Sequence, residues 1–252
     1  GGSVRATGAT QSVTATVVSS STGSGAVGLL AMANQELNLS AGLSGGGEFN
    51  KTGSGTVKVG DSAGFTGTLN VNEGRVLVAG ALGTTSTTVM GSGSLLGGSG
   101  TVGSVFWNAG ARYEWGLRNL TGVAGTDWDL VRVAGTLDLG LLNSSDKFNL
   151  SLLSDGSLDL SNGYEWTFLQ AANFAGLGNL TLGSDVTSFF NITTQGMDVG
   201  TEPANVRVLV GSTVNGLNSL NLRVVPEPSA QSLLALGMAA LVAVRSMRRK
   251  QS

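Results

Sequence analysis

The side chains of this chain that could do chemistry are carboxylates. The sequence has no His and no Cys, which removes Ser-His-Asp and Cys-His nucleophilic sites and zinc sites of the usual ligands. Asp127, Asp129 and Asp138 lie close in sequence, while Glu114 and Glu165 each lie between aromatic residues. Because paired carboxylates can hydrolyse glycosides, one hypothesis is a carbohydrate-active enzyme that uses these acids.

A structural role for the same acids is the competing interpretation. Asp127 and Asp129 flank Trp128, a pattern typical of solvated residues on the outer face of a strand. Asp-Trp-Asp is not an EF-hand pattern, although a calcium site at these aspartates is a further alternative. The glycine-rich runs lack the Gly-Lys-Ser/Thr of phosphate loops, so they indicate tight corners. We therefore predict that the chain is not an enzyme and holds no metal or cofactor.

The charge balance argues against nucleic acid as a partner. The chain has 14 basic and 16 acidic residues, and four of the basic residues lie beyond residue 244, so residues 1–244 have a net charge of −6. Nucleic-acid-binding proteins usually present a basic surface. Hydrophobic residues make up 41% of the chain and charged residues 12%, so it can bury a core, unlike a disordered chain.

Short β-type runs of alternating apolar and polar residues recur with a period of 19–20 residues. One series, with members 20 apart, is Leu29, Phe49, Leu69 and Val89; the other, 19 apart, is Val18, Leu37, Val57, Val76 and Leu95. Two interleaved series are typical of a coil in which each turn adds more than one strand. We therefore predict an all-β fold, a parallel β-helix (solenoid) with glycines at its corners. Asn50 and Asn70 should stack in a ladder, and an antiparallel sandwich is the alternative.

Residues 43–78 also resemble a known repeat. They contain Phe49, Lys51, then Gly-x-Gly-Thr before Val57 and Val59, then Phe-Thr-Gly at 65–67 and Val-x-x-Gly-x-Val-x-Val at 71–78. This order is similar to the autotransporter-associated β-strand repeat. The resemblance implies a right-handed β-helix that is exported and displayed at the cell surface.

Residues 106–225 differ from the repeat. All four tryptophans lie here: Trp107, Trp115, Trp128 and Trp166. Longer strands are predicted at 111–117, 128–139, 147–153, 164–171, 205–210 and 220–225. We expect three parts: a β-helix over 1–105, a β-rich continuation or cap over 106–225 with the tryptophans in its core, and a distinct tail over 226–252.

The tail begins with Pro226-Glu227-Pro228, which should be extended and unable to continue a helix. An apolar run follows, predicted to form a single hydrophobic helix; its membrane-contacting residues would be Leu233, Leu234, Leu236, Leu241, Val242 and Val244. The basic residues after it are Arg245, Arg248, Arg249 and Lys250. A helix of 12–15 residues is about 18–23 Å long, shorter than the usual span of about 20 residues. The cations could extend it by reaching the headgroups, and they favour a cytoplasmic C-terminus.

This tail resembles the PEP-CTERM sorting signal of Gram-negative bacteria that make exopolysaccharide. The resemblance implies that an exosortase recognises Pro226, Glu227 and Pro228 and removes the tail; an ordinary weak C-terminal anchor is the alternative. A signal peptide should accompany the signal, and the chain opens with Gly-Gly-Ser rather than Met, so we interpret it as a fragment. We expect an exported, adhesin-like structural protein, first anchored in the inner membrane, then retained in the envelope or matrix, with exosortase, membrane and exopolysaccharide as partners.

Overall fold

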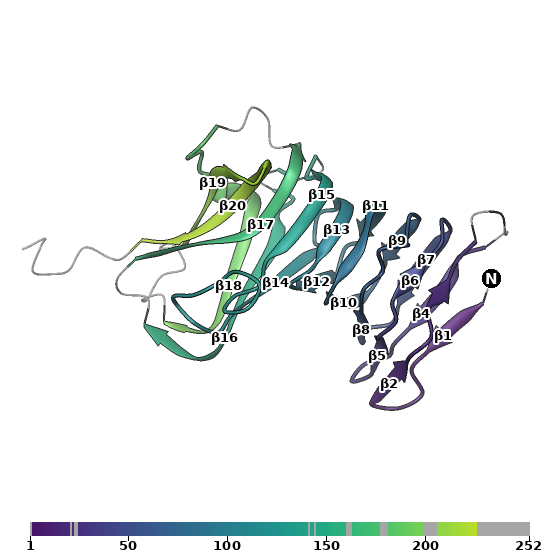
Figure 1. The fold of residues 1–252 in the computed structure, drawn as a ribbon. Coiled ribbons are helices and arrows are strands. Elements are labelled where there is room, and N and C mark those ends of the chain that lie inside the picture. The colour runs from purple at the N-terminus through teal and green to yellow at the C-terminus, as the bar shows by residue number, and fades with distance from the viewer. Residues whose placement is uncertain are drawn as a thin grey trace, which may run out of the picture.

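The computed structural model describes residues 2–225 except 21, 23–24, 141, 144, 160–162, 177–180 and 199–205. The described chain is all-β, as predicted: it has no α-helix, and its one helical element is the short 3-10 helix η1 (Thr187–Phe189). Its strands lie side by side along an elongated body, with the N-terminal strands at one end (Figure 1). The hydrophobic helix predicted for the tail falls outside the described residues.

Two large sheets form this body. Sheet A has ten strands, in the spatial order β1 (Ser3–Arg5), β4 (Val27–Leu30), β7 (Glu48–Thr52), β9 (Thr68–Val71), β11 (Ala81–Met90), β13 (Thr101–Trp107), β15 (Val131–Asp138), β17 (Tyr164–Ala175), β20 (Leu217–Val224) and β19 (Val206–Val214). Sheet B has eight strands, in the order β18 (Phe190–Asp198), β16 (Phe148–Asp159), β14 (Arg112–Leu117), β12 (Ser94–Gly98), β10 (Gly74–Val78), β8 (Thr56–Val59), β5 (Glu36–Leu39) and β2 (Thr10–Val13).

The chain alternates between the two sheets, so each turn of the coil adds one strand to each. Every pair within sheet B is parallel, and so is every pair in sheet A from β1 to β17. A small third sheet pairs β3 (Val17–Val18) with β6 (Leu43–Ser44), also in parallel. This is the pairing of a β-helix-like coil, and it excludes the antiparallel sandwich for these strands.

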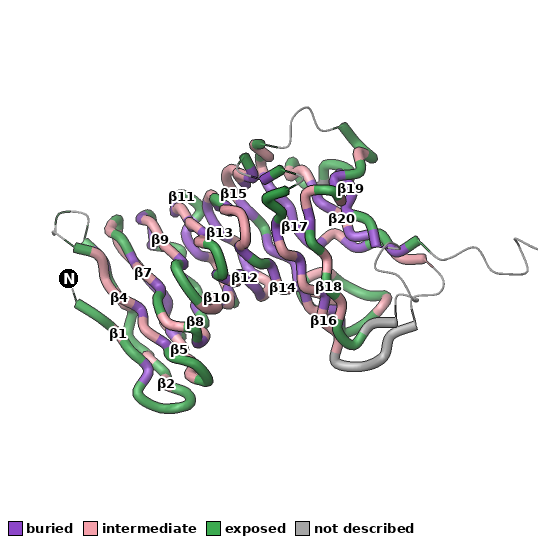
Figure 2. Tube along the Cα trace, turned by 180° about the vertical axis from the view of Figure 1, so that it is seen from behind, coloured by how far each residue is buried: buried purple, intermediate pink, exposed green. Residues whose placement is uncertain are grey.

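The core lies between the two sheets. Along the short strands, buried residues alternate with partly or fully exposed ones, as in β5, β8 and β9, and Figure 2 shows these buried positions recurring strand after strand. One inward column runs in register from Leu37 through Val57 and Val76 to Leu96, all four fully buried. Stacking equivalent apolar side chains in this way removes them from water and is the main stabilising term of such a coil.

The predicted 19–20-residue series is right in part. Leu37, Val57 and Val76 stack as expected, and Phe49 stacks on Leu69. Three members are wrong because the period shortens locally: Leu95 and Val89 are each one residue out of register, so both point outward, and Val18 is 63% exposed in the third sheet. Because side chains alternate along a strand, a one-residue shift moves a residue to the other face.

Glycines make the corners of the narrow coils, as the sequence predicts. Gly83 has a φ of +45°, and a Cβ there would collide with the carbonyl oxygen of Phe65 one turn earlier. Gly67 meets the carbonyl oxygen of Gly47 in the same way. The chain can turn this tightly only where successive corners touch backbone to backbone.

The coil widens after residue 105. In sheet B, Thr56 pairs with Glu36, 20 residues earlier, and Arg75 with Thr56, 19 earlier. Asn149 instead pairs with Arg112, 37 residues earlier, and Asn191 with Asn149, 42 earlier. Both sheets nevertheless continue without a break through β13, whose residues span the expected boundary. At the far end, β20 pairs antiparallel with β17 and with β19, and this hairpin closes sheet A.

The longer strands predicted beyond residue 106 are confirmed as β14 to β17, β19 and β20, and Phe190–Asp198 adds β18. Of the tryptophans, Trp107, Trp115 and Trp166 are buried in the core and Trp128 packs against it. The segment 28–39 forms strand, turn and strand, as expected from its place in the repeat.

Candidate functional site

The predicted sorting residues cannot be placed. Pro226, Glu227, Pro228, the apolar run and the basic residues after it all fall outside the described residues. The last described strand, β20, ends at Val224, two residues before Pro226. The functional geometry of the described chain therefore concerns the carboxylates and the outer faces of the coil.

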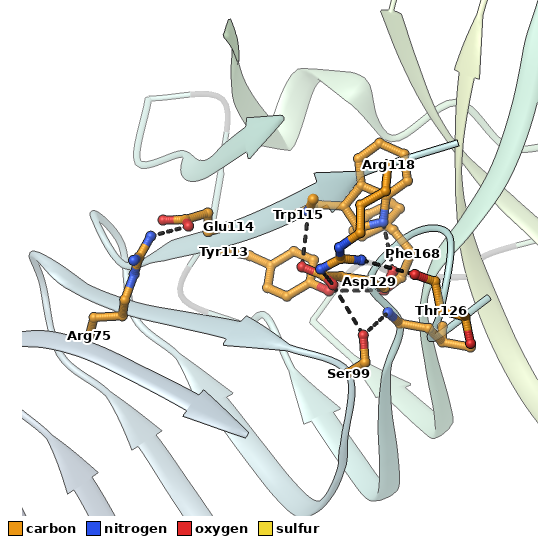
Figure 3. A network of polar contacts seen from close by, with 11 residues as sticks. Arg75, Ser99, Tyr113, Glu114, Trp115, Arg118, Thr126, Asp129 and Phe168 are labelled. Carbon is orange, nitrogen blue, oxygen red and sulfur yellow. Dashed lines mark hydrogen bonds and ion pairs between the residues drawn. The ribbon is translucent and has the colours of Figure 1, made fainter. Parts of the chain in front are cut away.

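Asp129 is the most enclosed of the candidate acids, and its contacts are structural (Figure 3). Its two carboxylate oxygens accept hydrogen bonds from Arg118 Nη2 at 2.8 Å, the Gly116 backbone N–H at 3.0 Å and Ser99 Oγ at 3.1 Å. Its backbone carbonyl accepts the Trp115 indole N–H at 2.7 Å. These bonds fasten the 118–129 loop against strands β12 and β14 and leave Asp129 no free role as a nucleophile or base.

The other acids are separately engaged. Asp127 accepts the Val123 backbone N–H at 2.7 Å inside its own loop, and Asp138 accepts the Gly140 N–H at 2.8 Å. Glu114 forms an ion pair with Arg75, and Glu165 with Arg223. Asp127 and Asp129 thus do not converge on a common substrate position.

Within the described chain, no three acids come close enough together to hold a metal ion. Three of the four tryptophan indoles donate to backbone carbonyls in the same part of the coil: Trp115 to Asp129, Trp128 to Thr167 and Trp166 to Leu120. Burial, followed by the charge of Asp129, raises the pKa of the nearby Tyr113 well above its ordinary value. The aromatic residues of the wide coils are core, as the sequence predicts.

A buried cation fastens two narrow coils together. The Lys51 side chain is fully buried, and its ammonium group donates to the carbonyl oxygens of Thr52 (3.1 Å), Gly53 and, one turn later, Glu73 (2.9 Å). Burial lowers its pKa from 10.5 to about 8, while the Glu73 carboxylate acts in the opposite direction. In the repeat pattern this position therefore holds a corner together.

The predicted asparagine ladder is confirmed. Asn70 Nδ2 donates to Asn50 Oδ1 at 2.9 Å on the outer face of sheet A. A second ladder, which the sequence did not suggest, joins Asn191 Nδ2 to Asn149 Oδ1 at 3.1 Å on sheet B. The residues of this second pair are 42 apart, so no short period pointed to it.

The least expected surface feature is a polar row along the leading edge of sheet B. Its members are the outward residues at successive register positions: Glu36, Thr56, Arg75, Leu95, Arg112, Asn149 and Asn191. Two hollows, of about 500 Å³ and 440 Å³, lie along this row, and all seven residues line one or the other. Sequence reasoning missed the row because each member is ordinary alone. The available signal was the position just before the first inward residue of each strand.

The described chain contains no helix of sufficient length and apolarity to span a lipid bilayer. No protein-family model matches this sequence, and no curated protein matches it significantly. The functional argument therefore rests on the chain's own residues.

Proposed function

We propose that this chain is an exported, non-enzymatic scaffold of the cell surface or extracellular matrix. An exosortase would recognise Pro226, Glu227 and Pro228, and the hydrophobic helix would hold the chain at the inner membrane until that step. The lasting body would be residues 1–225, a right-handed parallel β-helix associated with exopolysaccharide.

The observation that carries the proposal is the continuous stacking of both sheets. From β1 to β17 in sheet A and from β2 to β18 in sheet B, each strand pairs in parallel with the next turn of the coil. A solenoid built this way is a rod that presents a long, repeated outer surface. Such a shape suits lateral contact with an extended polymer more than enclosure of a small substrate.

The state of the acids supports a non-enzymatic reading. Glycosidases need two carboxylates on either side of the scissile bond. Here Asp129 is saturated by hydrogen bonds, Asp127 is bound within its loop, and Glu114 is paired with Arg75. No enclosed pocket containing two acids is found among the hollows that the described residues line.

The position of the sorting motif supports processing. The hairpin formed by β19 and β20 closes sheet A, and the chain leaves it at Val225, which is 44% exposed. A Pro-Glu-Pro segment immediately after this point cannot join the sheet, because proline lacks the backbone N–H that a ladder needs. A membrane-embedded peptidase could therefore reach it without unfolding the coil.

Mass spectrometry of the mature protein's C-terminus tests the proposal. The full chain should be expressed in a Gram-negative host that has an exosortase, beside the variant Glu227→Ala. We expect the native chain to end near residue 226 and the variant to retain the tail. A native chain that still ends at Ser252 would overturn the processing part.

A cleavage assay tests the non-enzymatic part. We expect the chain incubated with acidic and neutral polysaccharides to release no new reducing ends. Release that disappears in Asp127→Asn, whose carboxylate caps only an exposed loop, would instead establish a carbohydrate-active enzyme.

A further inference from the structure

The polar row on sheet B is continuous along the coil. The register pairs Glu36 with Thr56, Thr56 with Arg75 and so on to Asn191, so seven successive strands each contribute one outward side chain. With about 4.8 Å between neighbouring strands, the row is about 29 Å long. The coil thus provides evenly spaced binding groups along a line.

The corner beside this row is kept low by glycines. Gly55, Gly74 and Gly93 line the first hollow, and Gly110 lines the second. The two hollows meet where Gly93 N–H donates to the Gly110 carbonyl at 3.1 Å. Together they form one open groove along the row, with Asn34, Gln35 and Ser54 on its flank.

The groove carries positive charge on an acidic protein. Arg75, Arg112 and Lys147 line it. Arg75 is neutralised by Glu114, but within the described chain neither Arg112 nor Lys147 forms an ion pair. These two free cations lie in the middle of the groove, because Arg112 pairs with Asn149, two residues after Lys147.

The lining selects one class of polymer. Arginine binds carboxylates through two parallel hydrogen bonds, and amide and hydroxyl side chains bind sugar hydroxyls. No aromatic residue lines either hollow in the described chain, so the stacking platform of single-stranded nucleic acid binding is missing. A β-strand peptide would need a free sheet edge, whereas the strands under this groove have neighbours on both sides from β5 to β16.

We propose that this groove binds an extended acidic polysaccharide lying parallel to the coil axis, with Arg112 and Lys147 on its carboxylates. The inference deepens the proposed function and rests on it, since it names the class of polymer that the scaffold would hold. The Arg75–Glu114 ion pair, which spans β12, fixes the groove wall rather than binding the polymer.

Affinity electrophoresis or calorimetry of the full chain tests this, with polygalacturonate as the acidic probe and dextran as the neutral one. We expect binding to polygalacturonate alone, weakened by salt. Arg112→Gln should weaken it about tenfold, the usual scale of one charge-assisted contact. The matched control is Arg132→Gln, an equally exposed arginine of β15 on sheet A, which should bind like the native chain.

A second pair of variants separates charge from folding. Leu95 points outward between Arg75 and Arg112, so Leu95→Glu should abolish binding while the isosteric Leu95→Gln retains it. Equal loss in both, equal loss in Arg112→Gln and Arg132→Gln, equal binding of dextran, or preferred binding of single-stranded DNA would each overturn the proposal.

The proposed function can fail separately. A processed C-terminus without binding to polygalacturonate would refute the groove and leave the sorted scaffold standing. Arg112-dependent binding by a chain that still ends at Ser252 would refute processing and leave the groove standing.

Discussion

The narrow coils and the wide coils of this protein use the same two sheets but fill them differently. In the narrow part, register partners lie 17–20 residues apart from β7 to β13 and strands are short, as in β8 and β9. In the wide part, partners lie 31–42 residues apart and β16 and β17 have 12 residues each. The same fold thus accommodates a twofold change in the length of chain per turn.

The difference shows what each part depends on. The narrow interior is filled by Val, Leu and Phe, with Phe49 edge-on to Phe65 at 5.4 Å, and its corners need glycine. The wide interior needs larger side chains: Trp107 stacks on Phe148 at 4.0 Å, and Trp115 lies 5.7 Å from Trp166. Space at the corner therefore limits the narrow coils, while filling the interior limits the wide ones.

The largest effect is expected from emptying the wide core. Trp115→Ala removes a fully buried indole and its hydrogen bond to Asp129, and it should lower the free energy of unfolding by about 3–5 kcal/mol. The matched change in the narrow core, Val57→Ala, should cost about 2 kcal/mol. Urea unfolding followed by circular dichroism measures both. Equal costs would break the distinction.

Crowding a narrow corner should come next. Gly83→Ala places a Cβ against the Phe65 carbonyl in a left-handed conformation and should cost about 3 kcal/mol. Gly93→Ala is the control: its φ is also positive, at +83°, but no atom lies within 4 Å of the added Cβ. It should cost about 1 kcal/mol. If thermal unfolding shows the same loss for both, close approach is not what selects glycine.

The loop of the wide part gives a smaller effect. Asp129→Asn removes the charge that Arg118 and the Gly116 N–H contact and should cost about 2 kcal/mol. Asp127→Asn, in the exposed part of the same loop, should cost less than about 1 kcal/mol. Urea titration of both variants decides; a more harmful Asp127→Asn would reverse the roles assigned to the two acids.

The smallest effect is a pH dependence confined to the narrow part. The pKa of Lys51 is about 8 in the folded chain and 10.5 when unperturbed. Between these values the unfolded chain binds more protons, so the free energy of unfolding should rise with pH from about 8 upward. Measurements should stop near pH 9.5, before tyrosines ionise at about 10.

The control for this titration is Lys51→Met. It should be flat over the same pH range, because no group is left at the corner to lose its proton. If the native chain is as flat as Lys51→Met, or loses stability over this range, the buried ammonium is not what titrates.

The sequence predicted the narrow part better than the wide part, for a physical reason. A short period makes register visible, so Leu37, Val57, Val76 and the Asn50–Asn70 ladder follow from spacing alone. Where the period slipped by one residue, at Val89 and Leu95, spacing gave the wrong face. In the wide part no short period exists, so strands could be located but their partners could not.

The candidate site was harder to predict than the fold. The acids drew attention because of their type, yet their roles depend on distant partners such as Ser99 with Asp129, 30 residues apart. The polar row arises only when seven strands are brought into register, and none of its residues is unusual alone. Spacing can therefore locate a solenoid's strands long before it identifies the surface that binds.

Engineered cysteine pairs test most directly whether one parallel coil runs through both parts, since the chain has no native Cys. Asn50 with Asn70 and Asn149 with Asn191 are register partners in the narrow and wide parts, with Cα atoms about 5 Å apart, within disulfide range. Both double variants should form an intramolecular disulfide, whereas Asn50→Cys with Asn149→Cys should not. Failure of the Asn149–Asn191 pair, with the Asn50–Asn70 pair formed, would contradict a continuous coil.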